Sequence, residues 1–158
     1  MTGLLGKLRR IRIACEADIY AAAQRAKRLA QTLCFDEVAW TRMGTIALEL
    51  ARNALIHGGG GCMHLCGLYE AGRIGLEIEV RDDGPGIGDL ERALADGYST
   101  AGGLGQGLGA ARRLSDEFEI ASRPGGGTRV RARVWRETAD ESEYRSIIDR
   151  FYDRYPLR

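Results

Sequence analysis

Residues 73–88 read RIGLEIEVRDDGPGIG, and this stretch decides the fold class. Its first nine residues alternate between apolar and polar side chains, the two-residue period of a strand with one buried face. Asp82 is the next residue in the series of every second position that is predicted to be buried, so it lies on the core side of the strand end. A carboxylate there is costly to bury unless a donor reaches it, and a simple turn cap with Asp83 and Gly84 is the alternative.

The flanking segments predict helices and strands around this strand. Residues 9–15 predict a first strand, and Asp18 fits the N-cap of a helix that runs to Leu33. A second helix is expected to begin near Asp36 and to end at the glycines 58–61, which supply a left-handed C-cap. Further predictions are strands at 62–69, 117–121 and 128–135 and helices at 89–95 and 107–115. This order predicts an α+β fold, a mixed sheet covered by helices on one face.

The composition is that of one globular domain. The 158 residues are 44% hydrophobic and 28% charged with a net charge of +1, which excludes a disordered chain and a strongly basic nucleic-acid binder. Only Lys7 and Lys27 are lysines, and neither stands in a G-x-x-x-x-G-K-[ST] loop. Since V-A-I-K and H-R-D-x-x-x-x-N are also absent, the P-loop and the eukaryotic-type kinase apparatus are excluded.

The chain is expected to be cytoplasmic. It contains no run of about 18 apolar residues, and its basic stretch 7–12 is not followed by a signal-peptide core. The four cysteines suit a reducing compartment as small buried side chains. The spacing Cys62-x-His64-x-Cys66 fits a strand better than a zinc site, because no second pair of ligands accompanies it.

Two polar residues are predicted to meet at the strand ends. In strand 128–135 the apolar residues share one parity, which also places Thr128 on the inward side. Asp82 and Thr128 then point into one apolar pocket. Asp82 also begins the sequence D-x-G-x-G, whose glycines Gly84 and Gly86 let the backbone approach a flat ligand.

Glu49 and Asn53 form a second candidate pair. They are four residues apart, so they project from one face of the second helix, next to its apolar stripe. Surface polarity is one interpretation. In the functional interpretation, Asn53 offers a hard oxygen to Mg²⁺ and Glu49 offers a carboxylate that orients or deprotonates a nucleophile.

The glycine-rich run GGLGQGLG at 102–109 opens a helix. Backbone N–H groups at such a helix start bind phosphate. Gly105, Gly107 and Ala110 also match a dinucleotide-binding fingerprint. No strand precedes them and no acidic residue follows about 20 positions later, so the Rossmann interpretation is rejected.

In this order, four motifs resemble the N, G1, G2 and G3 boxes of the GHKL ATPase/kinase superfamily. They are E-x-x-x-N (Glu49, Asn53), D-x-G-x-G (Asp82, Gly84, Gly86), G-x-G (Gly105, Gly107) and Gly-Thr (Gly127, Thr128). ELARNALIHGGG and PGGGTRVRARVW are similar to the anti-sigma-factor type of serine/threonine kinase, especially the switch kinases of bacterial stressosomes. The resemblance covers residues 9–135 and implies the two-layer Bergerat ATP-binding fold.

The resemblance implies ATP and Mg²⁺ as cofactors and a role for each matching residue. Asp82 would accept a hydrogen bond from the adenine amine, beside the D-x-G-x-G glycines and with support from Thr128. Asn53 would ligate Mg²⁺ between the phosphates. Glu49 would act on the attacking hydroxyl group.

The resemblance also implies a phosphate lid lined by Gly105, Gly107 and Leu108. His57 would approach the ribose or the phosphates, and packing at the helix end is the alternative for it. Relatives typically carry a basic residue in the lid, whereas this chain has Ala-Gly-Gly at 101–103.

Residues 1–136 are expected to form the GHKL-type kinase domain and residues 137–158 a C-terminal helical extension. An apolar stripe from Tyr144 to Tyr155 either packs on the domain or docks a partner.

Two functions are considered. The first is an ATP-Mg²⁺-dependent serine/threonine kinase that phosphorylates a STAS-domain antagonist in a partner-switching module. The second is a nucleotide-gated binding module that sequesters a sigma factor or activates a PP2C-type phosphatase with little catalysis.

Overall fold

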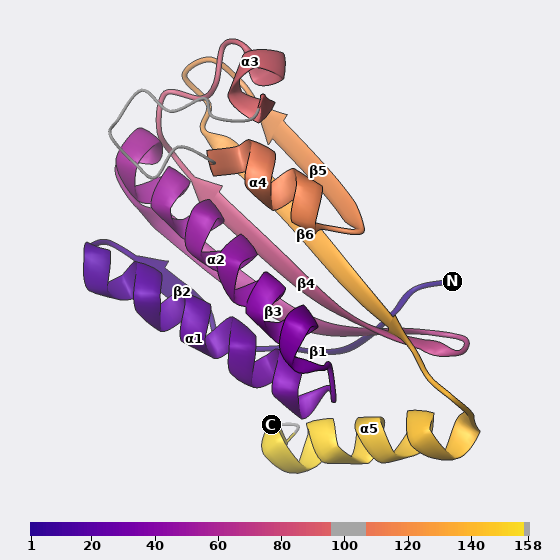
Figure 1. Ribbon diagram of the computed structural model, residues 1–158. Coiled ribbons are helices and arrows are strands. Elements are labelled where there is room, and N and C mark those ends of the chain that lie inside the picture. Colours follow the sequence, from indigo (N-terminus) through magenta and orange to yellow (C-terminus); the bar gives the residue numbers. More distant parts are fainter. Residues whose placement is uncertain (96–106, 157–158) are drawn as a thin grey trace.

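The computed structural model describes residues 1–95 and 107–156, and they form an α+β fold with a six-stranded sheet (Figure 1). The strands follow the order β1-β3-β4-β6-β5, and β2 also pairs with β3. All five pairings in the described part of the chain are antiparallel. The α+β prediction is confirmed, while the predicted mixed pairing is wrong. β3 with β4 and β5 with β6 are hairpins, which are antiparallel by construction.

The helices and strands lie close to the predicted positions. The helices are α1 (Glu16–Thr32), α2 (Glu37–Gly58), α3 (Leu90–Leu94), α4 (Gly107–Leu114) and α5 (Glu141–Arg154). The strands are β1 (Gly3–Lys7), β2 (Ile11–Ile13), β3 (Gly61–Glu70), β4 (Arg73–Asp82), β5 (Glu117–Ser122) and β6 (Thr128–Glu137). None of the helices in these described ranges combines the length and the apolar character that a membrane span requires.

The first edge of the sheet differs from the single strand predicted at 9–15. β1 pairs with one end of β3 and β2 with the other. Between them Leu8 N donates to Leu65 O at 2.8 Å, so the two short strands follow β3 as one interrupted edge. The local sequence does not reveal this division, because it depends on how the two short strands pair with the distant strand β3.

The two long helices begin with side-chain caps. Asp36 is the N-cap of α2 and its carboxylate accepts from Ala39 N at 2.8 Å, as predicted. Asp18 is not the N-cap of α1. It is the N3 residue of a capping box whose N-cap is Cys15, and its carboxylate accepts from Ala14 N at 2.9 Å and Cys15 N at 3.2 Å. The helix therefore starts three residues before the predicted position.

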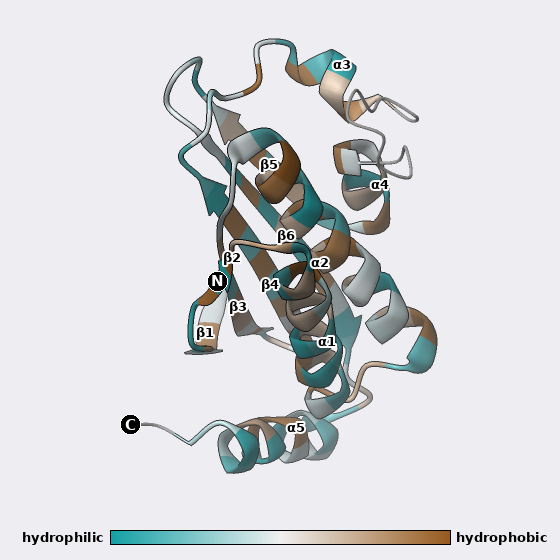
Figure 2. Cartoon of the chain, turned by 90° about the vertical axis from the view of Figure 1, so that its left-hand side faces the viewer, coloured by the Kyte–Doolittle hydropathy of each residue, from teal (hydrophilic) through white to brown (hydrophobic). Residues whose placement is uncertain are grey.

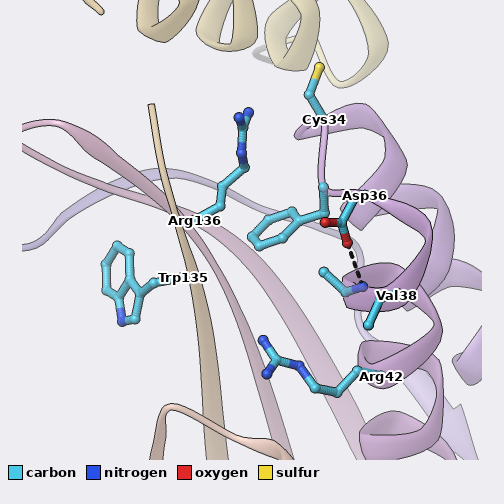
Figure 3. A pocket seen from close by; sticks show the side chains of 8 residues that line it. Cys34, Asp36, Val38, Arg42, Trp135 and Arg136 are labelled. Atoms are coloured by element: carbon cyan, nitrogen blue, oxygen red, sulfur yellow. Dashed lines mark hydrogen bonds between the residues drawn. The ribbon is translucent and has the colours of Figure 1, made fainter. Parts of the chain in front are cut away.

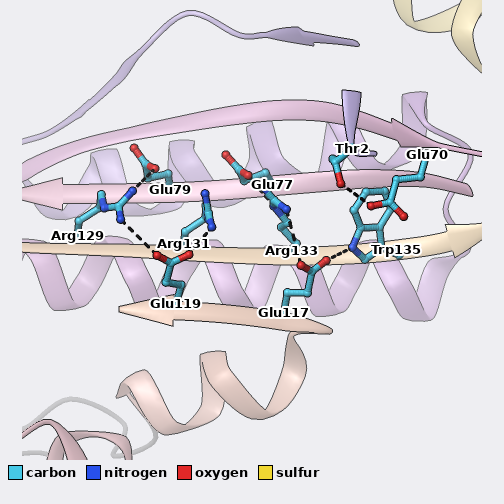
Figure 4. Close-up of polar contacts among 10 residues, drawn as sticks. All are labelled: Thr2, Glu70, Glu77, Glu79, Glu117, Glu119, Arg129, Arg131, Arg133 and Trp135. Carbon is cyan, nitrogen blue, oxygen red and sulfur yellow. Dashed lines mark hydrogen bonds and ion pairs between the residues drawn. The ribbon is translucent and has the colours of Figure 1, made fainter. Parts of the chain in front are cut away.

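The sheet has one apolar face and one charged face. α1 and α2 lie side by side on the apolar face (Figure 1), where the residues predicted to point inward are buried: Ile74, Leu76, Ile78, Val80, Val130, Ala132 and Val134. The strands accordingly alternate between hydrophobic and hydrophilic residues along their length (Figure 2). The opposite face carries arginine and glutamate side chains (Figure 4).

Helix α5 closes the end of the core away from α3 (Figure 1). Its Ile147 and Phe151 are buried, and the Phe151 ring lies over Gly67 of β3, where an added Cβ would come within 3.0 Å of the ring. Tyr152 Oη donates to Leu5 O of β1 at 2.9 Å. The apolar stripe of this helix thus packs on the domain itself.

Candidate functional site

Asp82 and Thr128 meet at the end of the apolar face, as the strand parity predicts. They are direct partners in the register of β4 and β6. Asp82 is half-buried and Thr128 is buried. One carboxylate oxygen of Asp82 accepts from Gly84 N at 2.9 Å. Burial raises the pKa of Asp82, and the N–H groups of Gly84 and Thr128 offset part of that shift.

Glycines allow three segments to converge on Asp82. Gly58, the last residue of α2, lies so close that an added Cβ would collide with the Asp82 carboxyl group. A Cβ on Gly84 would in turn meet the Gly58 backbone. Gly86 has φ of 80° and lies against Arg123 O, a place that only glycine fills without strain. The end of α2, the loop after β4 and the start of β6 therefore form one compact unit.

Ser122 joins this unit, although the sequence analysis did not single it out. Its hydroxyl accepts from Ile87 N at 2.7 Å and lies 3.0 Å from the Thr128 hydroxyl. It thereby fastens the loop after β4 to the β5–β6 hairpin. The sequence does contain a signal for Ser122, because it lies two and four residues after Ile120 and Phe118 and so shares their side of the strand.

Glu49 and Asn53 lie on α2, and both are half-buried. The Glu49 carboxylate pairs with Arg52 Nη1 at 3.3 Å, and the two side chains are only 12% and 18% exposed. The Glu49 carboxylate is therefore largely enclosed and already paired with a cation.

His57 lies in the last turn of the same helix and is exposed, so it is not packed at the helix end. His57 is among the groups that lower the pKa of Asp82.

The glycine-rich run is described from Gly107 onward, and Gly105 lies outside the described residues. Gly107 opens α4, whose Leu108 and Ala111 are buried. α4 packs beside α2 (Figure 1). α4 is therefore held against the helix that carries Glu49 and Asn53.

A cavity of about 500 Å³ opens at this end of the sheet, and its lining includes Asp82, Leu90, Ser122 and Thr128. A second cavity of about 350 Å³ lies at the start of α2, where Arg42 of α2 and Arg136 of β6 extend toward it (Figure 3). The 22 residues of α2 separate the two.

The cysteine and histidine side chains of β3 do not form a metal centre with others. Cys62, His64 and Cys66 share one face of the strand, but the described ranges contain no group of three or more His, Cys, Asp or Glu residues placed to hold an ion. Burial, assisted by the nearby Glu77 charge, raises the pKa of the Cys66 thiol to about 11. That thiol is therefore uncharged at neutral pH.

Comparison with known proteins identifies relatives of this arrangement. The family model of histidine kinase-, DNA gyrase B- and HSP90-like ATPases matches residues 40–138, a range that contains every residue of the site. The serine/threonine-protein kinase RsbT of Bacillus subtilis is 42% identical over 125 residues, 79% of this chain and 94% of that protein.

Two more distant similarities accompany these. The anti-sigma F factor of Clostridium acetobutylicum is 33% identical over 88 residues, 52% of this chain and 60% of that protein. The solved structure of the mycobacterial sensor histidine kinase MprB has a TM-score of 0.46 at 17% identity, over 82% of this chain and 99% of that chain. This structural overlap is too loose to support a functional argument.

Proposed function

The chain belongs to the family of histidine kinase-, DNA gyrase B- and HSP90-like ATPases, and on that premise we propose that it is an ATP-Mg²⁺-dependent serine/threonine protein kinase. Its substrate is a serine or threonine of a STAS-domain antagonist, and phosphorylation switches the partners of a bacterial anti-sigma or stressosome module. The similarity to RsbT over nearly the full length of that kinase supports the reaction class. We place the protein in the cytoplasm, where ATP is supplied and its four free cysteines stay reduced.

The inward pair of Asp82 and Thr128 is the observation that carries the proposal. Backbone N–H groups donate to the half-buried Asp82 carboxylate, but burial still raises its pKa, so a ligand that donates a further hydrogen bond would stabilise it. The exocyclic amine of adenine is such a donor, and the apolar residues beside Asp82 suit a flat ring. The hydroxyl groups of Thr128 and Ser122, 3.0 Å apart, complete the polar edge.

Asn53 is the residue proposed to hold Mg²⁺. Its amide oxygen is a hard ligand, and the described residues around it include no cluster of three acidic or histidine ligands. This donor set fits an ion that is bound mainly by phosphate oxygens and water, as Mg²⁺ is in nucleotide sites. When bound, the ion neutralises the negative charge of the phosphates.

Glu49 is proposed as the general base. It lies one helical turn before Asn53, and its proposed role is to accept the proton of the substrate hydroxyl group as the phosphoryl group is transferred. Arg52 holds one carboxylate oxygen at 3.3 Å, which restricts the rotamers of Glu49.

The phosphates are proposed to lie at the start of α4. The N–H groups of Gly107 and Leu108 at this helix end favour anions, and we assign Gly105 to the same lid. His57 is exposed on the Asp82 side of α2 and is proposed to approach the ribose or the phosphates. Gly84 and Gly86 shape the loop beside the adenine ring.

Incubation with radiolabelled ATP and the STAS proteins encoded beside this gene tests the proposal. We expect Mg²⁺-dependent label on a serine or threonine of one STAS protein, and no label with Glu49→Gln, which keeps the shape but not the base. A protein that binds ATP and never labels any of them contradicts the kinase proposal.

The similarity to an anti-sigma F factor favours a second candidate, a nucleotide-gated binding module. Such a protein sequesters a sigma factor or activates a PP2C-type phosphatase with little catalysis. The two candidates differ in their dependence on Glu49. Partner binding that requires ATP and is unchanged in Glu49→Gln would support the module.

A further inference from the structure

The charged face of the sheet has two halves with different electrostatics. On β4, β6 and β5 the charges alternate across the strands (Figure 4). Arg133 lies between Glu77 and Glu117, with its closest contacts at 2.7 Å and 3.7 Å. Arg131 lies in the same way between Glu79 and Glu119. Each arginine is flanked by two carboxylates, so this half satisfies its own charges.

The other half has no acid on β3 between Cys62 and Cys66, and Asp18 of α1, whose pKa Arg12 lowers, lies near its end. Lys7 of β1 is opposite Cys66, and Arg12 of β2 is opposite Cys62, so both cations share the charged face. Lys7 and Arg12 are exposed. The β3 side chains that separate them from β4 are Cys62, His64 and Cys66, none of which is acidic.

Arg81 extends this basic region to the site. It is 58% exposed and is the direct cross-strand partner of Arg129, another cation. Like charges in this arrangement are unfavourable. Both arginines form ion pairs with the same carboxylate, Glu79, Arg81 at 2.8 Å and Arg129 at 3.6 Å. We call Lys7, Arg10, Arg12 and Arg81 the basic edge patch.

His64 lies within the patch and responds to it. Burial lowers the pKa of His64, Lys7, Arg81 and Arg10 lower it further, and Glu79 acts in the opposite direction. Its buried Nδ1 atom has no hydrogen-bond partner within the described residues. Cations from β1, from β4 and from the segment between β1 and β2 thus surround His64.

We propose that the basic edge patch docks an acidic segment of a protein partner. Lys7 and Arg12 are separated by the length of β3 from Cys66 to Cys62, ~13 Å, and the patch extends ~10 Å across the strands. An extended chain with acidic residues at alternate positions presents carboxylates on one side at intervals of ~7 Å, so two such intervals span the ~13 Å between Lys7 and Arg12. β1 and β2 are also edge strands, so their outer backbone groups are not paired within the sheet, although Leu5 O already accepts from Tyr152 Oη.

The partner is a protein rather than a nucleic acid. Four cations on a chain with a net charge of +1 neutralise few phosphates of a duplex. Arg81 directly precedes Asp82 and lines the 500 Å³ cavity, so a segment docked here lies next to the proposed nucleotide site. The identification of the partner with the kinase substrate rests on the proposed function, whereas the recognition of acidic segments does not.

Peptide binding tests the recognition directly. The probe is a fluorescein-labelled peptide with glutamate at every second position, measured by anisotropy at low salt. We expect Lys7→Glu/Arg12→Glu to weaken binding about tenfold or more. The matched control is Arg25→Glu/Arg28→Glu, which makes the same charge change at exposed positions of α1 and is expected to bind like wild type. ATP affinity, measured in the same samples, reports that all variants are folded.

Each result decides the proposal. Equal losses in the two double variants would show that only net charge matters and would overturn it. A duplex DNA of similar length that binds more tightly than the peptide, with the same sensitivity to Lys7→Glu/Arg12→Glu, would also overturn it. With the STAS substrate, a raised KM at unchanged kcat for Lys7→Glu/Arg12→Glu supports docking. Absence of STAS phosphorylation by wild type contradicts the proposed function alone, because the peptide result still stands.

Discussion

The two faces of strands β4 and β6 use polar residues in opposite ways. On the inner face the strands are apolar until their ends, where Asp82 and Thr128 stand together. On the outer face polar residues are the rule, and arginines such as Arg133 pair with glutamates such as Glu77. A buried carboxylate with no cationic partner raises the free energy of the ligand-free protein, whereas the paired charges of the outer face offset one another. Inner polar residues therefore indicate function, and outer ones mainly contribute to solubility and stability.

Glu49→Ala is expected to have the largest effect. It tests whether Glu49, an enclosed acid on α2, takes part in the phosphoryl transfer. Phosphorylation of the STAS substrate should fall by about 10²–10⁴, the usual contribution of a general base. ATP affinity should remain close to wild type, because Asp82 and Asn53 are intact. Single-turnover transfer of labelled phosphate measures the first quantity and calorimetry the second. Glu119→Ala, on the outer face, is the control, and equal loss in both variants would contradict the distinction between faces.

Asp82→Asn is expected to weaken ATP binding about ten- to hundredfold. A charged hydrogen bond in a half-buried site is lost, which costs on the order of 1.5–3 kcal/mol. Because burial raises the pKa of Asp82, the ionised carboxylate lowers the stability of the apo protein as pH rises through that pKa. Without ATP, Asp82→Asn should therefore be at least as stable at pH 7. Calorimetric titration and thermal unfolding check both points, and an unchanged affinity would remove Asp82 from the adenine site. The exposed neighbour Asp83→Asn is the control.

Asn53→Ala is expected to weaken nucleotide binding by about tenfold, and only when Mg²⁺ is present. Its proposed role is to hold the ion, so a chelator should abolish the difference from wild type. Titrations with excess Mg²⁺ and with EDTA measure this. Equal losses in both conditions would show that Asn53 acts on the nucleotide or on the fold.

Arg133→Ala is expected to have the smallest effect and to leave ATP binding unchanged. Arg133 pairs with Glu77 on the outer face, and the Arg133 side chain is 19% exposed. Removing this ion pair should lower the free energy of unfolding by about 1 kcal/mol. A double-mutant cycle with Glu77→Ala, measured by urea unfolding, isolates the pair. A loss of ATP affinity here would break the separation between the two faces.

Local patterns determined much of this protein in advance. The alternation in 73–82 and 128–135 predicted both buried faces and the inward positions of Asp82 and Thr128, because side chains on a strand repeat every two residues. Asp36 predicted the start of α2, and the glycines after it predicted its end, since caps depend on neighbouring residues alone.

Tertiary structure decided the features that depend on pairing between distant residues. The register of β3 divides the first edge into β1 and β2, and hairpin geometry makes the sheet antiparallel. Ser122 reaches Ile87 across 35 residues. The basic run 7–12 becomes part of a patch only when β4 brings Arg81 onto the same face. Such contacts require a register that no local period encodes, because it results from packing the whole core at once.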